Sequence, residues 1–591
     1  MFDIKELCKD AVDGIKDNEG IYTEDKLIKG LKHIVRENMD YSETRRSLIQ
    51  VSLELTNDME PNWQYVASKL YTYELYEKVK KLRGIESIND LYKNYYEFIE
   101  ELTNRNLYGK YILDNYSKED ILELEKEIKP ERDFIFNYSG IDLITKRYLV
   151  QDFNRDVIEL PQQMFMGIAM HLAIPEKKEN RVYWAKRFYD VLSSLKATMA
   201  TPTMSNARKP FYQLSSCFID SVEDSLEGIY KSLDNFAEVS KFGGGMGIYI
   251  GKVRALGSSI RGFKGASGGV IPWAKLFNDT AVAVDQLGVR NGSVAIWLDA
   301  WHKDIPEFLQ IRTNNGDDRK KAHDVFPGIC YPDLFWKLAE NDIDADWYMM
   351  CPHEIKLVKG YSLEDFYGEE WEEKYYDCVN DERIDKRVMS VKDIVRLIIK
   401  SAAETGAPFA FFRDTVNDMN PNKHAGMIYS SNLCTEIMQN MSPMKIEGNK
   451  IVESEEGYSV INKIIPGDFV VCNLSSVVLG NIDVCNDEEV EYVVETQIRA
   501  MDNVIDLNYY SVPFAEITNK KYRAIGLGTS GYHHMLANNK IHWTEEKHKN
   551  FADEVYEKIN YYAIKSSMKI SKEKGAYEFC LLYTSDAADD K

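Results

Sequence analysis

Asn432-Leu433-Cys434-Thr435-Glu436 is the most informative stretch of this 591-residue chain. In an extended strand side chains alternate between two faces, so Asn432, Cys434 and Glu436 would point the same way. The row would present an amide, a thiol and a carboxylate together. A thiol can supply a hydrogen atom or an electron, a carboxylate can take a proton from a hydroxyl, and an amide can hold a substrate in register. The stretch therefore predicts a catalytic layout on an extended strand.

Two further cysteines have distinctive surroundings. Cys217 ends the run Leu214-Ser215-Ser216-Cys217, and Cys472 lies in Val471-Cys472-Asn473-Leu474-Ser475. The chain has nine cysteines and no CxxC pair, which fits neither a zinc site nor a secreted disulfide framework. The ten histidines show no HExxH-like spacing, so no metal site is predicted. The ordinary role of a lone cysteine is that of a small buried hydrophobe, and we expect it for Cys330, Cys351, Cys378 and Cys485.

These motifs, in this order, resemble the large, catalytic subunit of class I ribonucleotide reductase. The resemblance runs from about Tyr148 to about Phe579. It includes Thr201-Pro202-Thr203-Met204-Ser205 before Cys217 and Arg523-Ala524-Ile525-Gly526-Leu527-Gly528 after Cys472. It implies an α/β fold, a ten-stranded α/β barrel of the ribonucleotide reductase type with a finger loop through its centre. We expect this barrel to be incomplete at the C-terminus and to follow an all-α N-terminal region.

The pattern of the chain agrees with an α/β fold. Short apolar runs such as 246–250 and 468–472 alternate with helical segments, which indicates βα units and a largely parallel sheet. Periodicity alone does not distinguish one α/β barrel from another. Residues 1 to about 140 lack strand-like alternation and have apolar residues at helical spacing.

The resemblance implies a ribonucleoside-diphosphate reductase that converts ribonucleotides into 2′-deoxyribonucleotides by thiyl-radical chemistry. Cys434 would be the thiyl that removes the 3′ hydrogen, with Glu436 as the base on the 3′-hydroxyl and Asn432 as its hydrogen-bonding partner. Cys217 and Cys472 would protonate the departing 2′-hydroxyl, deliver two electrons and end as a disulfide. The implied substrate-binding residues are Thr201, Ser216, Cys217, Gly245, Asn432, Glu436 and Arg290.

One helix is clearly marked. Asp224-Ser225 can cap its N-terminus, and Gly243-Gly244-Gly245 ends it. Its apolar stripe consists of Leu226, Ile229, Tyr230, Leu233, Phe236 and Ala237. The stripe can face the protein's own core. The resemblance places the helix instead at a homodimer interface beside a specificity-effector site.

The effector site implied by the resemblance takes ATP, dATP, dTTP or dGTP. Asp224 would bind a deoxyribose hydroxyl and Arg254 would face the phosphates. The full set of implied effector-binding residues is Asp224, Ser225, Leu226, Arg254 and Arg261. Gln286-Leu287-Gly288-Val289-Arg290-Asn291-Gly292 resembles the mobile loop that carries the effector signal to the substrate, with Arg290 at its tip.

The resemblance also implies partners. No cofactor would be bound covalently; the radical would come from a dimetal centre in a separate small (beta) subunit, and thioredoxin or glutaredoxin would supply reducing electrons. Leu433 and Thr435 favour this class over cobalamin-dependent class II reductases, whose strand usually reads Asn-Pro-Cys-Gly-Glu. The alternatives are such a class II enzyme or a truncated nucleotide-binding fragment without activity.

We expect four segments. Residues 1–75 resemble a partial ATP-cone domain, and 76–147 form the helical N-terminal part of the reductase large subunit. The basic β-hairpin that usually opens an ATP-cone is absent, so the alternative for 1–75 is a helical packing domain without a ligand. Residues 148–579 would be the incomplete catalytic barrel, and 580–591 resemble nothing in the family.

Composition limits the function further. The 73 basic and 95 acidic residues give a net charge of −22, which argues against nucleic acid as the main ligand. A local pocket of glycines and arginines can still hold a single nucleotide. The apolar stretches are too short to span a bilayer, and the N-terminus has acidic residues where a secretory signal needs an apolar core. A cytoplasmic protein without a membrane partner is predicted.

Overall fold

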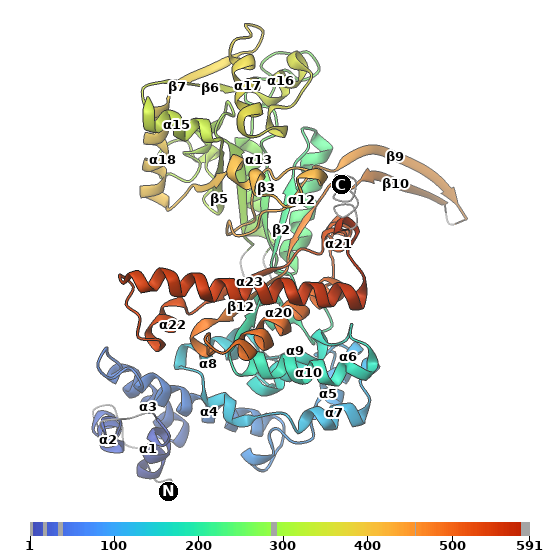
Figure 1. The fold of residues 1–591 in the computed structure, drawn as a ribbon. Helices are drawn as coiled ribbons and strands as arrows, with labels where there is room; N and C mark the ends of the chain where they lie inside the picture. The colour runs from blue at the N-terminus through green and yellow to red at the C-terminus, as the bar shows by residue number, and fades with distance from the viewer. Residues whose placement is uncertain (1–3, 16–19, 33–38, 285–291, 456, 581–591) are drawn as a thin grey trace. The chain divides into compact units, whose positions relative to one another are not determined.

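The computed structural model describes residues 4–15, 20–32, 39–284, 292–455 and 457–580. The chain forms two compact units, and each draws on segments that are far apart in sequence (Figure 1). The first unit consists of residues 1–214, 475–507 and 527–569. The second consists of residues 215–474, 508–526 and 570–591.

The first unit is mainly helical, which confirms the predicted all-α N-terminal region. Local capping defines helix ends: Asp40 accepts from the Glu43 backbone N–H at 2.8 Å, and Glu43 accepts from the Asp40 backbone N–H at 3.0 Å. Three short strands, β1 (Ala197–Met199), β12 (Leu474–Val478) and β13 (Gly526–Ser530), form a sheet in the order β1-β12-β13. The helices are α1 (Ile4–Val12), α2 (Glu24–Leu31), α3 (Tyr41–Leu55), α4 (Trp63–Leu82), α5 (Tyr95–Asn104), α6 (Tyr111–Asn115), α7 (Lys118–Glu125), α8 (Tyr138–Leu143), α9 (Pro161–Leu172), α10 (Lys178–Ser193), α11 (Thr201–Asn206), α20 (Asp487–Leu507), α22 (Tyr532–Asn538) and α23 (Glu546–Lys574), whose last turn belongs to the second unit.

The second unit is built on a curled six-stranded sheet with the order β11-β2-β3-β4-β5-β8. Neighbours from β2 to β8 are parallel, and β11 is antiparallel to β2. The strands are β2 (Cys217–Ser221), β3 (Gly245–Tyr249), β4 (Val294–Asp299), β5 (Val325–Tyr331), β8 (Phe409–Phe412) and β11 (Val470–Cys472). Parallel strands joined through helices are the βα pattern, so the predicted α/β class is confirmed. In the described part of the chain this sheet is a half-barrel.

Helices cover the outer face of this sheet (Figure 1). Strand residues that face them, such as Phe218, Met246 and Ile296, belong to one buried apolar cluster with the helices. The helices of the unit are α12 (Leu226–Lys241), α13 (Ile271–Ala283), α14 (Ile305–Phe308), α15 (Asp333–Asn341), α16 (Pro352–Lys359), α17 (Gly368–Val379), α18 (Val391–Thr405), α19 (Arg413–Asp418) and α21 (Pro513–Tyr522). A two-stranded antiparallel sheet, β6 (Asp346–Met350) and β7 (Lys386–Ser390), lies among them.

The helix predicted after Asp224 is α12. The Ser225 hydroxyl accepts a hydrogen bond from the Gly228 backbone N–H at 3.0 Å and caps the helix. The predicted apolar stripe divides in two. Ile229 and Phe236 are buried in the outer cluster, whereas Leu226 and Tyr230 are 61% and 51% exposed. The stripe therefore faces the protein's own core only in part.

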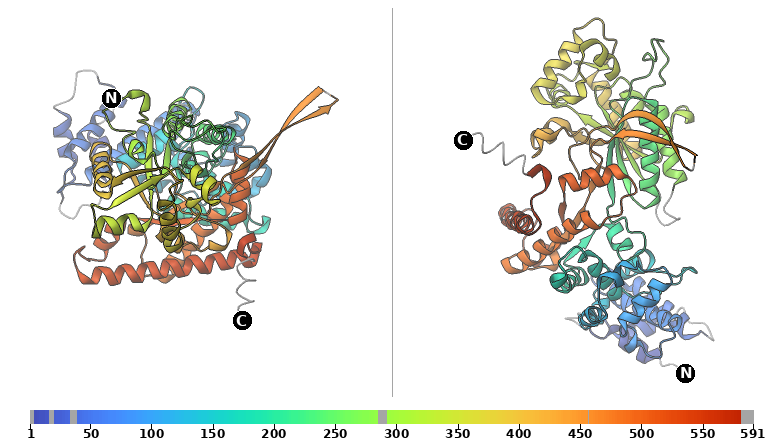
Figure 2. Two further views of the ribbon diagram at one scale, coloured as in Figure 1. Left: turned by 90° about the horizontal axis from the view of Figure 1, so that it is seen from above. Right: turned by 90° about the vertical axis from the view of Figure 1, so that its right-hand side faces the viewer.

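The loop between α19 and the next strand packs on the inner face of the half-barrel. Its residues Ile428, Tyr429, Leu433 and Met441 are buried together with inward-facing strand residues such as Trp297. A hairpin follows, formed by β9 (Lys445–Ser454) and β10 (Gly457–Ile465), and it projects from the rest of the second unit (Figures 1 and 2). In the described part of the chain, no helix is long and apolar enough to cross a bilayer.

Candidate active site

Cys217 and Cys472 are direct partners in the antiparallel pair of β2 and β11. Both thiols are free and buried. Opposed residues in an antiparallel ladder have Cα atoms about 4.5–5.5 Å apart, within the range of roughly 4.4–6.8 Å that a disulfide requires. The register thus brings together two cysteines that are far apart in sequence, and a disulfide between them needs little backbone movement.

The two thiols differ in acidity. The hydrogen bond with Cys472, helped by contacts with Asn432 and Ser216, lowers the pKa of Cys217 to about 7 despite burial. Burial, followed by the hydrogen bond with Cys217, raises the pKa of Cys472 well above its ordinary value. Within the pair, Cys472 therefore donates the hydrogen bond and Cys217 is the more acidic thiol.

Removal of the Cys472 thiol should make Cys217 less acidic. In Cys472→Ala the main group that stabilises the Cys217 thiolate is lost while burial remains, so we expect the pKa of Cys217 to rise above its native value of about 7. Thiolate absorbance at 240 nm, titrated against pH in the variant and in the native chain, measures this shift. The absorbance change near pH 7 should be present in the native chain and in Cys378→Ala, which removes a different buried thiol. A midpoint that stays near 7 in Cys472→Ala would refute this effect of Cys472 on the pKa of Cys217.

The extended strand predicted for residues 432–436 is wrong. The segment is a turn in which Thr435 has a φ of +69°, in the left-handed region. The Asn432 side-chain oxygen accepts hydrogen bonds from the backbone N–H groups of Glu436 and Ile437, each at 3.1 Å. This side chain satisfies backbone donors that strand pairing would otherwise satisfy, so the chain folds back on itself here.

The turn nevertheless presents the predicted groups at different depths. Cys434 and Glu436 are exposed, whereas Asn432 is fully buried and contributes to the acidity of Cys217. Asn432 therefore links the turn to the cysteine pair. Leu433, between Asn432 and Cys434 in the sequence, packs into the apolar cluster on the inner face of the half-barrel and anchors the turn to the sheet.

Two glycines of β3 make room for this turn. A Cβ atom on Gly247 would lie 2.1 Å from the Ser431 carbonyl oxygen, and one on Gly245 would lie 2.8 Å from Leu433 Cδ2. Both distances are shorter than real Cβ contacts, so the loop backbone lies where side chains of β3 would otherwise be. Gly245, predicted to bind substrate, thus has the loop as its neighbour.

The other predicted substrate residues are spread over the chain. Ser216 precedes β2; its backbone oxygen accepts from the Gly245 N–H at 2.8 Å, and its side chain contributes to the acidity of Cys217. Thr201 belongs to the first unit, where it begins α11 and is exposed. Arg290 lies outside the described residues.

The predicted effector residues Asp224 and Arg254 bind each other. Arg254 Nε lies 3.1 and 3.0 Å from the two Asp224 carboxylate oxygens, and the Arg254 backbone N–H donates to the same carboxylate at 3.1 Å. Arg254 Nη1 also donates to the Ser259 carbonyl at 2.7 Å. His353, at the start of α16, places Nδ1 3.3 Å from Asp224 Oδ2. No sequence motif pointed to His353, because it lies far along the chain from both partners.

The remaining effector residues surround this cluster. Ser225 caps α12 and Leu226 is exposed beside it. Arg261 is exposed in the loop that Arg254 anchors, with a φ of +51°. Cys351 is buried under this loop and accepts from the Ala255 N–H, as expected for a structural thiol. Cys485 is exposed, so its predicted burial is wrong.

Comparisons with known proteins place this geometry in a family. The family described as "Ribonucleotide reductase, barrel domain" matches residues 215–590, and that described as "Ribonucleotide reductase, all-alpha domain" matches residues 134–212. The chain belongs to the ribonucleotide reductase family. The barrel match contains the cysteine pair, the 432–436 turn and the Asp224 cluster.

Similar proteins have names that agree with this family. The chain is 55% identical to "Ribonucleoside-diphosphate reductase subunit alpha" of Treponema pallidum (strain Nichols) over 556 residues, or 94% of this chain and 65% of that protein. It is 40% identical to the protein of the same name in Helicobacter pylori (strain ATCC 700392 / 26695), over 97% of this chain and 74% of that protein. It is 32% identical to "Ribonucleoside-diphosphate reductase large subunit" of Monkeypox virus, over 88% of this chain and 62% of that protein. This reductase chain thus spans just under two thirds of the Treponema protein.

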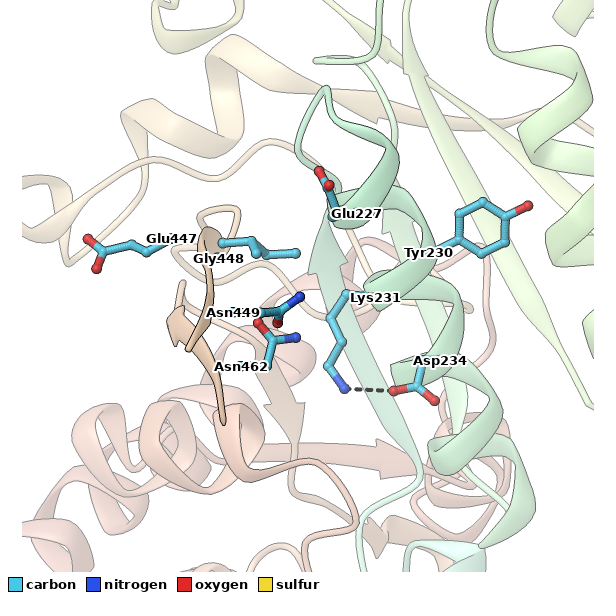
Figure 3. Close-up of a pocket in the computed structure, with 9 residues that line it drawn as sticks. Glu227, Tyr230, Lys231, Asp234, Glu447, Gly448, Asn449 and Asn462 are labelled. Carbon is cyan, nitrogen blue, oxygen red and sulfur yellow. Dashed lines mark hydrogen bonds and ion pairs between the residues drawn. The ribbon is translucent and has the colours of Figure 1, made fainter. Parts of the chain in front are cut away.

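A surface pocket of about 460 Å³ lies elsewhere on the second unit, between α12 and the β9–β10 hairpin (Figure 3). The Asn449 and Asn462 side chains face α12, where Lys231 pairs with Asp234 at 2.6 Å. None of the predicted catalytic or effector residues lines this pocket. Among the described residues, no group of three or more His, Cys, Asp or Glu is arranged to hold a metal ion.

Proposed function

We propose that this reductase chain is the catalytic (alpha) subunit of a ribonucleoside-diphosphate reductase, which makes 2′-deoxyribonucleotides for DNA synthesis. The observation that carries the proposal is the direct pairing of Cys217 with Cys472 across β2 and β11, with Asn432 of the Cys434 turn beside the pair. A buried, paired dithiol is suited to delivering two electrons and a proton to one substrate. The names of the similar proteins support the diphosphate substrate and favour this activity over a cobalamin-dependent enzyme.

The proposed reaction assigns one task to each residue. A thiyl at Cys434 takes the hydrogen atom from C3′, and Glu436 accepts the proton of the 3′-hydroxyl. Asn432 is the hydrogen-bonding partner of Glu436. Cys217, the more acidic thiol, protonates the 2′-hydroxyl, which leaves as water. Cys472 gives its hydrogen atom to C2′ and forms a disulfide with Cys217; the remaining electron of the pair returns to the 3′ carbon as Glu436 returns the proton to the 3′ oxygen. Cys434 then returns the hydrogen atom to C3′. Thr201, Ser216, Gly245 and Arg290 would hold the substrate.

Partners and regulation follow from the family. We propose a homodimer through α12, whose Leu226 and Tyr230 are exposed, and an effector site for ATP, dATP, dTTP or dGTP at Asp224, Ser225, Leu226, Arg254 and Arg261. The name "subunit alpha" of the similar proteins supports a separate small (beta) subunit, which would supply the radical from its dimetal centre. Thioredoxin or glutaredoxin would reduce the disulfide, in the cytoplasm.

The segment boundaries are also proposals. Residues 1–75 would be the ATP-cone-like domain, and the buried apolar side chains of α1 to α4 support a common core there. Residues 76–147 would be the helical N-terminal part of the large subunit and 148–579 the catalytic barrel. The tail assigned to 580–591 lies outside the described residues, except for Cys580.

The dithiol role predicts a specific disulfide. In one turnover with CDP and a radical-generating small subunit, without external reductant, the protein expressed from its complete gene should form one disulfide per deoxynucleotide, linking Cys217 to Cys472. Peptide mapping by mass spectrometry under non-reducing conditions identifies the link. Cys472→Ala should form neither the link nor product, whereas Cys485→Ala, which removes an exposed thiol, should form both. Product formed while both thiols remain free would refute the role.

A further inference from the structure

His353 contacts the candidate effector site although no sequence motif includes it. Its ring nitrogen Nδ1 lies 3.3 Å from Asp224 Oδ2, the oxygen that also contacts Arg254 Nη2 at 3.0 Å. The side chains of all three residues are 20–24% exposed, so they form a partly open cluster. The cluster holds one carboxylate, one permanent cation and one group that can gain or lose a charge near neutral pH.

All three guanidinium nitrogens of Arg254 already contact protein groups. Its Nε and Nη2 are directed at Asp224, and its Nη1 donates to the Ser259 carbonyl. A guanidinium that turns toward a triphosphate must give up at least part of this pairing. Asp224 would then be a partly buried carboxylate that has lost its main cation, which is unfavourable unless another positive group replaces it.

His353 is the group positioned to replace Arg254. The ionisable groups that act on it are Asp224, before α12, Arg254, in the loop after β3, and Lys356, on its own helix. Burial, then the charge of Arg254, lowers the pKa of His353 below its ordinary value of 6.5, while Asp224 acts in the opposite direction. Movement of Arg254 toward phosphate removes one of the groups that keep the ring neutral, and the effector brings negative charge nearer.

We propose that His353 is a positioning residue of the effector site: as Arg254 turns toward the phosphates of a deoxynucleoside triphosphate, His353 takes up a proton and holds the Asp224 carboxylate in place. This inference rests on the effector site of the proposed function. It makes effector binding proton-linked. The pKa of His353 is lower in the free protein than in the bound one, so protons are taken up on binding between those two values. Effector affinity therefore rises as pH falls through that window.

Isothermal titration calorimetry with dTTP tests this linkage directly. Titrations at several pH values between about 6 and 8, in buffers of different ionisation enthalpy, give both the affinity and the number of protons taken up. The native chain should take up as much as about one proton, and its affinity should change by at most about tenfold per pH unit, the limit for one linked proton. His353→Gln keeps a polar side chain but cannot be protonated. The proton uptake due to His353, and the pH dependence of affinity that it causes, should therefore be lost. The titration of dTTP itself is common to both proteins and cancels in the comparison.

A matched control is His323→Gln, which removes an exposed histidine of the same unit and should leave proton uptake unchanged. A second readout needs no ligand: in Arg254→Gln the pKa of His353, followed by NMR of 15N-labelled histidine, should rise above its native value. If dTTP binds to the native chain and to His353→Gln with identical proton uptake, the inference about His353 is overturned, but the proposed effector site is not. No binding of dTTP at any pH would overturn the effector site itself, and the inference with it.

Discussion

Serine in place of Cys434 should abolish ribonucleotide reduction. The proposed reaction begins with a thiyl that abstracts the 3′ hydrogen, and a serine hydroxyl cannot take this role because its O–H bond is much stronger than an S–H bond. Cys434 is exposed on its turn, whereas Cys217 and Cys472 are buried and paired with each other, so neither replaces it. We expect CDP reduction to fall on the order of a thousandfold or more, as when a group on which the chemical step depends is removed.

The control for this experiment is Cys485→Ser, which removes another exposed thiol and should keep native activity. Both variants are assayed with the protein expressed from its complete gene, a small subunit and dithiothreitol. In Cys434→Ser, oxidation with diamide should still link Cys217 to Cys472, which shows that the fold around the dithiol is intact. Turnover at the native rate in Cys434→Ser would rule out the thiyl assignment.

The cysteine pair and the Cys434 segment lie together as predicted, whereas the local structure predicted for that segment is wrong. Cys217, Cys472 and the 432–436 segment came from a resemblance of separated motifs, and the structure brings all three together on one half-barrel. The helix after Ser225 was predictable as well, because a capping hydroxyl and apolar residues at helical spacing are local features.

The strand predicted for 432–436 is wrong because side-chain alternation requires an extended backbone, and this segment is a turn. Asn432 accepts from two backbone N–H groups ahead of it, a local interaction that competes with strand pairing. An asparagine at the start of a short polar segment is itself a turn signal, so Asn432 favours a turn over a strand here. Side chains do not alternate regularly between two faces in this segment, because Thr435 adopts a positive φ.

The pairings at the candidate effector site could not be predicted in this way. Asp224 and Arg254 were each assigned to a nucleotide, but in the structure each is the main partner of the other. His353 joins them from the start of α16, through contacts that depend on how the loops over the outer face of the sheet come together. Nothing in the local sequence encodes such long-range contacts.

The glycines of β3 lead to the second large prediction. The resemblance assigned Gly245 to substrate binding; in the structure the backbone that approaches Gly247, two residues along the same strand, is that of the loop bearing Cys434. In Gly247→Ala the new Cβ would lie 2.1 Å from the Ser431 oxygen and 2.8 Å from Asn432 Cα. Both are backbone atoms, so no side-chain rotation relieves the overlap, and the loop must move by roughly 1 Å.

Because Asn432 holds the turn together, that movement carries Cys434 and Glu436 with it. A misplacement of about 1 Å at a reacting group costs about a hundredfold in rate, so we expect CDP reduction by Gly247→Ala to fall by about that factor. Overpacking should also lower the stability of the fold by about 1–3 kcal/mol, measured by denaturant unfolding. The matched control is Gly268→Ala, whose Cβ would meet its nearest neighbour, Pro272 Cγ, at 3.4 Å and should be nearly neutral in both assays. If Gly247→Ala retained native activity, the close contact between β3 and the loop would not set the position of Cys434, and the site would have to tolerate a displaced turn.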